Sequence, residues 1–206
     1  MASLAGEVAL VTGGGVRIGA AIVEALARAG AGVVIHHRRS RVEAERLAHR
    51  VRAGGGNAWL VKGDLAKARD RGRLLTDAAK AAGAPVTLLV NNASSFPESR
   101  MADLSFDGLV EAIEVNAWAP FALTRTFAEQ LPDKRRGAVV NLVDARVADY
   151  DWGHVGYWLA KGMLADLTRA RELLGYQPIV PMDQGMGWTL RWYRETLSGE
   201  AERKAV

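Results

Sequence analysis

The chain has 206 residues, of which 49% are hydrophobic and 24% are charged, with a formal net charge of +4, and this excludes a disordered chain. It contains no cysteine, which excludes disulfides, thiolate metal sites and cysteine nucleophiles. Its four histidines lack metal-binding spacing, no stretch approaches the ~18 apolar residues of a membrane span, and no basic leader marks a signal peptide, so we expect a cytoplasmic protein without a metal or a membrane partner.

Short runs of apolar, β-branched residues alternate along the chain with segments of helical period. The runs predict strands at residues 7–12, 32–36, 57–61, 86–90 and 138–143. The other segments predict helices at 18–29, 42–53, 71–82, about 106–131 and 153–174. The alternation predicts an α/β fold, a doubly wound parallel sheet of Rossmann-like type with right-handed crossovers.

The first predicted strand ends in a glycine-rich turn, residues 12–19, that opens a helix. Ligands of open parallel sheets bind outside the carboxyl ends of the strands. Glycines let the backbone approach a pyrophosphate, and free N–H groups at a helix start face the anion. Such a turn can be purely structural, but its position after the first strand predicts a dinucleotide site. The residues expected to contact the cofactor here are Gly13, Arg17, Ile18 and Gly19.

The end of the second predicted strand indicates which dinucleotide is bound. An NAD site usually places an acidic residue about 20 residues after the first glycine, whereas this chain has a basic run at 36–40. Guanidinium and hydroxyl groups can bind a 2′-phosphate that a carboxylate would repel. We therefore predict NADPH as the cofactor, held by His37, Arg38, Arg39 and Ser40. Asp64 and Leu65, after the third strand, occupy the place of an adenine corner, although Asp64 could equally cap a helix.

The stretch from Arg28 to Arg52 holds seven arginines and two glutamates. It contains no aromatic side chain on which a base could stack, so we do not expect a nucleic-acid partner. A solvated helix face or a pocket for a small anion fits this stretch better.

Further motifs stand at the later strand and helix ends. They are Asn91-Asn92-Ala93, Asn116 within a helix, and Tyr157 four residues before Lys161. Together with the glycine-rich turn they resemble the short-chain dehydrogenase/reductase family. The resemblance implies an oxidoreductase in which Tyr157 gives the proton, Lys161 holds the nicotinamide ribose and Asn116 orients a water-linked proton path. It also implies cofactor contacts from Asn92, Ala93, Ser94, Tyr157 and Lys161.

Three departures from the usual family pattern resemble the pteridine reductase branch. Arg17 stands where a glycine is usual, serines and Phe96 follow Asn-Asn-Ala, and Asp144 replaces the active-site serine thirteen residues before Tyr157. The resemblance covers about residues 6–170. It implies a pterin site lined by Arg17, Ser94, Phe96, Asp144 and Tyr157.

The residue types agree with that chemistry. Tyr157 and Lys161 are four residues apart on one predicted helix and so share a face. An ammonium beside a phenol stabilises the phenolate, which favours proton transfer near neutrality. An ionised Asp144 only accepts hydrogen bonds and suits a ring rich in N–H donors, or a protonated Asp144 relays a proton. Phe96 offers a flat face for stacking. As alternatives, Phe96 packs in the core, and Asp144 caps a helix or pairs with Arg146.

The tail differs from the pattern of a classical member. Residues 175–206 lack the expected strand, turn and covering helix, and they resemble the carboxyl end of an extended, epimerase-like member. We therefore expect a catalytic domain at 1–174 and an atypical tail with a short helix at 175–206, with the sheet truncated or altered at its last strands. The exposed edge that results predicts a homo-oligomer, either a dimer or a tetramer.

The leading hypothesis is an NADPH-dependent reductase that transfers a hydride to a pterin or dihydropterin ring. A carbonyl reductase acting on ketones is the nearest alternative. Because the substrate-covering elements are missing from the pattern, a non-catalytic NADPH-binding protein is a third.

Overall fold

The computed structural model describes residues 3–133, 135–148 and 151–169. Five parallel strands form one sheet in the order β3-β2-β1-β4-β5. The strands are β1 (Val8–Val11), β2 (Gly32–His37), β3 (Ala58–Lys62), β4 (Leu88–Asn91) and β5 (Ala138–Asn141). This confirms the five predicted strands and the doubly wound parallel sheet. The strand order reverses between β1 and β4, and a crevice at the carboxyl ends of these two strands is where such sheets bind ligands.

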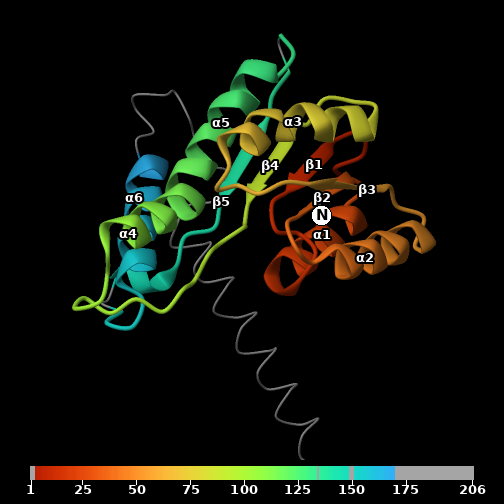
Figure 1. The fold of residues 1–206 in the computed structure, drawn as a ribbon. Coiled ribbons are helices and arrows are strands. Elements are labelled where there is room, and N and C mark those ends of the chain that lie inside the picture. The colour runs from red at the N-terminus through yellow and green to blue at the C-terminus, as the bar shows by residue number, and fades with distance from the viewer. Residues whose placement is uncertain (1–2, 134, 149–150, 170–206) are drawn as a thin grey trace, which may run out of the picture. The chain divides into compact units, whose positions relative to one another are not determined.

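Two layers of helices cover the sheet, with α1 and α2 on one face and α3 and α5 on the other (Figure 1). The helices are α1 (Arg17–Arg28), α2 (Arg41–Ala53), α3 (Ala68–Ala82), α4 (Phe106–Ile113), α5 (Ala119–Gln130) and α6 (Val155–Arg169). They confirm the predicted helices within the part of the chain that is described. Residues 175–206 and the boundary expected at residue 174 lie outside it.

The core lies between the sheet and its helices. All four residues of β1 are buried, because a central parallel strand is covered on both faces and therefore reads as a continuous apolar run. Helix α2 buries one stripe, Ala44, Leu47, Ala48 and Val51, against β2 and β3. Each fully buried leucine or valine stabilises the fold by roughly 1.5–3 kcal/mol.

The long helix predicted at 106–131 is continuous but contains one π-helical turn, Glu114–Trp118, between α4 and α5. Ala119 donates its N–H to the carbonyl of Glu114, five residues back, which is the π pattern. Asn116 is buried within this turn, and π turns of this kind recur at functional sites.

Among the described residues, no helix is long and apolar enough to span a membrane.

Candidate cofactor and active site

The glycine-rich turn is fastened to the loop that follows β4. The Thr12 hydroxyl accepts hydrogen bonds from the N–H groups of Asn92, at 2.9 Å, and Ala93, at 3.0 Å. The side-chain amide of Asn92 donates to the carbonyls of Thr12 and Gly13, at 2.8 and 3.2 Å. Thr12 was not expected among the site residues, although it directly follows a buried strand. The two loops therefore form one rigid edge at the carboxyl ends of β1 and β4.

Two glycines in this turn are required by its geometry. Gly13 has a φ of +62°, and a Cβ there would lie 3.0 Å from Cα of Ala93. A Cβ on Gly19 would collide with the Gly13 carbonyl and the Asn92 amide. Only glycines allow the turn, the start of α1 and the β4 loop to pack this closely.

Arg17 is the one non-glycine residue with a positive φ, +51°, in the described part of the chain. A left-handed conformation costs a residue with a side chain roughly 1–2 kcal/mol. The family's usual glycine would avoid that cost. The exposed Arg17 side chain forms no hydrogen bond or ion pair with described residues, so its guanidinium is available at the first turn of α1.

The end of β2 brings a second set of predicted cofactor residues to the same edge. The ring of His37 is buried, and its Nδ1 has no hydrogen-bond partner among the residues described. Burial lowers the pKa of His37, and the charges of Lys62 and Arg41 lower it further. Ser40 lies beside the glycine-rich turn, since a Cβ on Gly15 would be 3.3 Å from the Ser40 hydroxyl. A buried ring nitrogen without a partner among the described residues and a hydroxyl close to the turn are both groups that can form a hydrogen bond with a phosphate.

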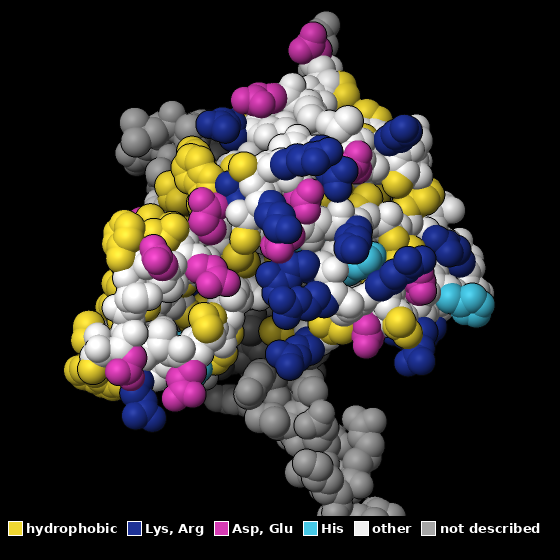
Figure 2. Space-filling view, in the orientation of Figure 1, with side chains coloured by type: hydrophobic (Ala, Val, Ile, Leu, Met, Phe, Trp, Pro, Cys, Tyr) yellow, Lys and Arg dark blue, Asp and Glu magenta, His cyan; other side chains and the backbone are white. Residues whose placement is uncertain are grey.

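Of the two arginines that directly follow β2, one lies in an ion pair and the other has no ion-pair partner among the described residues. Arg38 lies 3.5 Å from the carboxylate of Asp64 in a partly exposed ion pair. The exposed guanidinium of Arg39 has no such partner among described side chains. On the face drawn in Figure 2, Lys and Arg side chains gather over the half of the molecule that carries α1–α3. The local field at the end of β2 thus favours an anion.

The predicted adenine corner is built by local hydrogen bonds. The Asp64 carboxylate accepts the N–H of Ala66 at 3.2 Å, and the Asp70 carboxylate accepts the N–H of Asp64 at 2.9 Å. Asp64 therefore closes a turn ahead of α3 and does not cap that helix, whose N-cap residue is Lys67. Leu65 beside it is buried.

The loop after β5 and helix α6 bring three predicted catalytic residues together. Tyr157 donates its hydroxyl proton to the Asp144 carboxylate at 2.6 Å. One turn along α6, the Lys161 ammonium donates to the carbonyl of Leu142 at 2.7 Å and lies 5.8 Å from the Tyr157 ring centre. Burial lowers the pKa of Lys161 to about 8, although the charge of Asp144 opposes this. Tyr157 and Lys161 are 6% and 3% exposed, so their chemistry is largely screened from water.

An aromatic wall stands next to Tyr157. The Phe96 ring stacks on His154, with centroids 3.8 Å apart, and meets the Tyr157 ring edge-on at 4.6 Å. Phe96 is 47% exposed, so the alternative that it packs in the core is wrong. His154 Nδ1 lies 3.2 Å from both carboxylate oxygens of Asp151. His154 was not among the predicted site residues, although it stands three residues before Tyr157 and directly before α6.

Asn116 anchors the loop that carries Phe96. Its side-chain oxygen accepts the Ser94 hydroxyl at 2.8 Å and the Ser95 N–H at 3.0 Å. Its side-chain nitrogen donates to the carbonyls of Ser95 and Ala112, both at 2.9 Å. These four bonds use the whole capacity of the amide. Asn116 is thus a loop anchor in this structure, and its part in a proton path stays a prediction.

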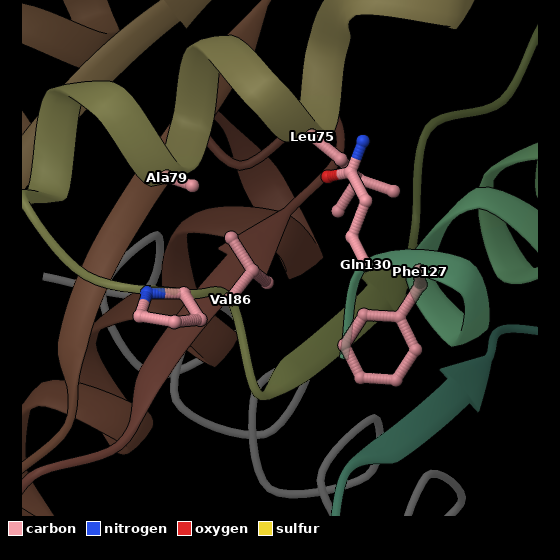
Figure 3. Close-up of a pocket in the computed structure, with 6 residues that line it drawn as sticks. Leu75, Ala79, Val86, Phe127 and Gln130 are labelled. Atoms are coloured by element: carbon pink, nitrogen blue, oxygen red, sulfur yellow. The ribbon is translucent and has the colours of Figure 1, made fainter. Parts of the chain in front are cut away.

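A separate hollow of about 180 Å³ lies between α3, α5 and the chain just before β4 (Figure 3). It is lined by Leu75, Ala79, Pro85, Val86, Phe127 and Gln130. It sits at the amino end of β4, away from the predicted site, and no candidate catalytic residue lines it.

The chain belongs to the short chain dehydrogenase family, whose model matches residues 7–176. It is 34% identical over 173 residues to galactitol 2-dehydrogenase of Rhizobium johnstonii, covering 81% of this chain and 65% of that protein. It is 33% identical over 207 residues to pteridine reductase 1 of Leishmania tarentolae, covering 81% and 70%. The chain thus spans about two thirds of the length of these relatives.

A solved structure similar to the chain is that of FolM alternative dihydrofolate reductase 1 from Brucella canis complexed with NADP. It is 38% identical, with a TM-score of 0.77, and the match covers 83% of this chain and 68% of that one. The resemblance of residues 175–206 to an epimerase-like member has no support in these similarities and stays a prediction.

Proposed function

We propose that the protein is an NADPH-dependent reductase of pterin or dihydropterin rings in which Tyr157 is the proton donor. The observation that carries this proposal is the 2.6 Å hydrogen bond from Tyr157 to Asp144. It puts an acid beside the proton donor, at the position where the family's serine would stand. The similarity to pteridine reductase 1 and to FolM supports the same substrate class.

The cofactor proposal rests on the edge formed by the ends of β1, β2 and β4. The glycine-rich turn would receive the pyrophosphate, together with Ile18 and Gly19 at the start of α1. His37, Arg39 and Ser40 would receive the 2′-phosphate, with Arg38 beside them. Asn92, Ala93 and Ser94 would line the path toward the nicotinamide. NADPH, when bound, supplies the hydride.

The proposed proton transfer depends on how Lys161, Tyr157 and Asp144 are arranged. The Lys161 ammonium stabilises negative charge that develops on the Tyr157 oxygen when its proton leaves. In the structure, the carboxylate of Asp144 accepts that same hydroxyl proton. An acceptor in this place also suits a ring edge that presents N–H donors, which a ketone lacks.

The stacking surface is supplied by Phe96, whose ring is half exposed beside Tyr157. A flat heterocycle that stacks on such a ring gains roughly 0.5–1.5 kcal/mol beyond the burial of its area. Arg17 keeps a strained backbone at the first turn, and strain of this kind is typical of residues that serve a ligand. We propose that its guanidinium contacts both cofactor and substrate.

A ketone reductase is the second candidate. The Tyr157–Lys161 pair suits a carbonyl oxygen as well as a ring nitrogen, and galactitol 2-dehydrogenase supports alcohol and ketone chemistry. Asp144 argues against this candidate, because an ionised carboxylate cannot donate a hydrogen bond to a carbonyl oxygen.

We also propose that the protein forms a homo-oligomer through its α4–α6 half. Large apolar side chains are exposed there, including Phe106, Trp118, Leu159, Met163 and Leu167. Hydrophobic side chains are also prominent over that half in Figure 2. Light scattering on the purified chain tests this, and a monomer at all concentrations would contradict it.

The test of the function is NADPH oxidation by the purified chain with a dihydropterin, followed in parallel with a panel of ketones. We expect turnover of the dihydropterin and its loss in Tyr157→Phe. Tight NADPH binding without turnover of either substrate class would instead support a non-catalytic NADPH-binding protein.

A further inference from the structure

We infer that His36 is a positioning residue whose imidazole holds the glycine-rich turn in the shape that receives the pyrophosphate of NADPH. The inference rests on the proposed placement of the cofactor at this turn. His36 was not among the predicted site residues, because only residues 37–40 were expected to bind the 2′-phosphate.

The His36 ring, on β2, joins the two loops that follow β1 and β3. Its Nδ1 accepts the backbone N–H of Gly13, after β1, at 3.0 Å. Its Nε2 lies 3.1 Å from the backbone carbonyl of Gly63, after β3. His36 itself is on β2 and is 2% exposed. One buried side chain therefore fixes the spacing of the strand ends that frame the proposed cofactor site.

These two partners define the protonation state of the ring. A backbone N–H only donates and a carbonyl only accepts, so the bonded form is the neutral imidazole with its proton on Nε2. A second proton on Nδ1 would point at the Gly13 N–H and break that bond. Burial lowers the pKa of His36 to about 4, although its bond to Gly63 opposes the shift, so the neutral form persists at physiological pH.

The Gly13 peptide is held from both sides. His36 accepts its N–H, and the Asn92 side chain donates to its carbonyl at 3.2 Å. The N–H of the next residue, Gly14, donates to the His36 carbonyl at 3.0 Å. The N–H groups of Gly13 and Gly14 are used in this way, whereas those of the first turn of α1 have no partner within the helix and remain for an anion.

The two parts of the proposed cofactor site should therefore respond differently when the bond from Gly13 to His36 is lost. The His36 bond acts on Gly13 at the start of the glycine-rich turn, whereas the proposed 2′-phosphate residues lie between the end of β2 and the start of α2. Loss of the bond to Gly13 should therefore weaken ligands that carry a pyrophosphate. It should spare adenosine 2′-monophosphate, which has the 2′-phosphate and no pyrophosphate.

Three substitutions separate the two hydrogen bonds of the ring. In His36→Asn the amide oxygen can replace Nδ1 and accept the Gly13 N–H. In His36→Gln the amide nitrogen can replace Nε2 and donate to Gly63, leaving the Gly13 N–H without an acceptor. His36→Leu removes both bonds. His49→Leu, at an exposed position on α2, is the matched control.

The experiment is calorimetric titration of the full chain and each variant with NADPH and with adenosine 2′-monophosphate. We expect the Kd for NADPH to rise about tenfold in His36→Gln and His36→Leu and to stay within about threefold in His36→Asn. The Kd for adenosine 2′-monophosphate should stay unchanged in every variant, and His49→Leu should match the wild type throughout.

Two results would overturn the inference. One is an unchanged NADPH affinity in His36→Gln, and the other is an equal loss of affinity for both ligands, which would mean that the ring only supports the fold. If His36→Leu does not fold, the comparison of His36→Asn with His36→Gln still decides. If the wild type does not bind NADPH, the proposed function itself is wrong. That result differs from a failure of the His36 inference, in which the wild type binds NADPH and only the affinities of the variants disagree with the expectation.

Discussion

Tyr157 and Asp144 are joined by a 2.6 Å hydrogen bond in which the phenol donates and the carboxylate accepts. The two residues come from α6 and from the loop after β5, and both are brought to the carboxyl edge of the sheet. An acid in contact with the proton donor changes which substrates the site can hold, because it offers an acceptor where an alcohol would also offer a donor.

Removal of the Tyr157 hydroxyl tests its role as proton donor. In Tyr157→Phe we expect the rate of dihydropterin reduction to fall by about 10²–10⁴-fold, the usual contribution of a positioned acid. The Kd for NADPH should change little, because the ring and the neighbouring Lys161 remain. Steady-state kinetics and calorimetry measure the two quantities, and a variant with wild-type turnover would remove Tyr157 from the mechanism.

Exchange of Asp144 tests substrate class. Asp144→Ser restores the hydroxyl typical of the family, and we expect it to lower dihydropterin turnover by at least about tenfold, the loss of one charge-assisted hydrogen bond. Ketone turnover should rise from its low starting value, since the serine can donate to a carbonyl oxygen. If ketones are already good substrates of the wild type, the ketone reductase candidate is the better one.

The pKa of Lys161 predicts opposite pH trends for activity and stability. Burial lowers this pKa from 10.5 to about 8, so the rate should fall above pH 8 as the ammonium loses its proton. Between about 8 and 10.5 the unfolded chain binds more protons at this residue than the folded chain, so the contribution of Lys161 to the free energy of unfolding rises with pH.

Lys161→Met removes the titrating amine, so comparison with the wild type isolates the contribution of Lys161 to the pH dependence of the free energy of unfolding. Urea unfolding of wild type and variant across this pH range gives the difference in free energy. A difference that does not change with pH would mean that Lys161 titrates normally.

Selectivity between NADPH and NADH tests the corner at the end of β2. In Arg39→Ala we expect the KM for NADPH to rise about tenfold and the KM for NADH to stay constant, because only NADPH carries the 2′-phosphate that a guanidinium binds. Arg28→Ala, an exposed arginine near the end of α1, is the control. Equal changes for both cofactors would place the 2′-phosphate elsewhere.

Asn116 should matter mainly for the loop that carries Phe96. Its four hydrogen bonds are buried or partly buried, and Asn116→Ala should lower the free energy of unfolding by about 1–3 kcal/mol, since it leaves the Ser95 peptide unpaired. Asn57→Ala, at an exposed site before β3, should be neutral. A variant that loses activity and keeps full stability would favour the predicted proton path instead.

Much of the fold follows from local pattern. The central strands are buried on both faces, so their apolar runs stand out, and the observed and predicted strand ends differ by at most two residues. The start of α3 lies three residues earlier than predicted because its first turn, from Ala68, is polar and lacks an apolar stripe. The π turn was not predicted, since no residue pattern marks it and Pro120 just after it is compatible with an ordinary helix start.

The sequence pattern indicated several residues of the candidate site, whose roles stay predictions, but not the hydrogen bonds that connect them. Tyr157, Lys161 and Asp144 stand in recognisable spacing, whereas the bonds of His36 join residues far apart in sequence, and no periodicity reveals them. The stacking of Phe96 on His154 also depends on the path of the loop after β4, and the hydrogen bonds of Asn116 hold that loop in place.

The most direct test of the account is the rate of NADPH oxidation by the purified chain with a dihydropterin, measured beside Asp144→Ser. The account predicts turnover by the wild type that is at least about tenfold faster than that of the variant, with the order reversed on ketones. Wild-type turnover of ketones alone, with NADPH bound and every pterin unreacted, would contradict it.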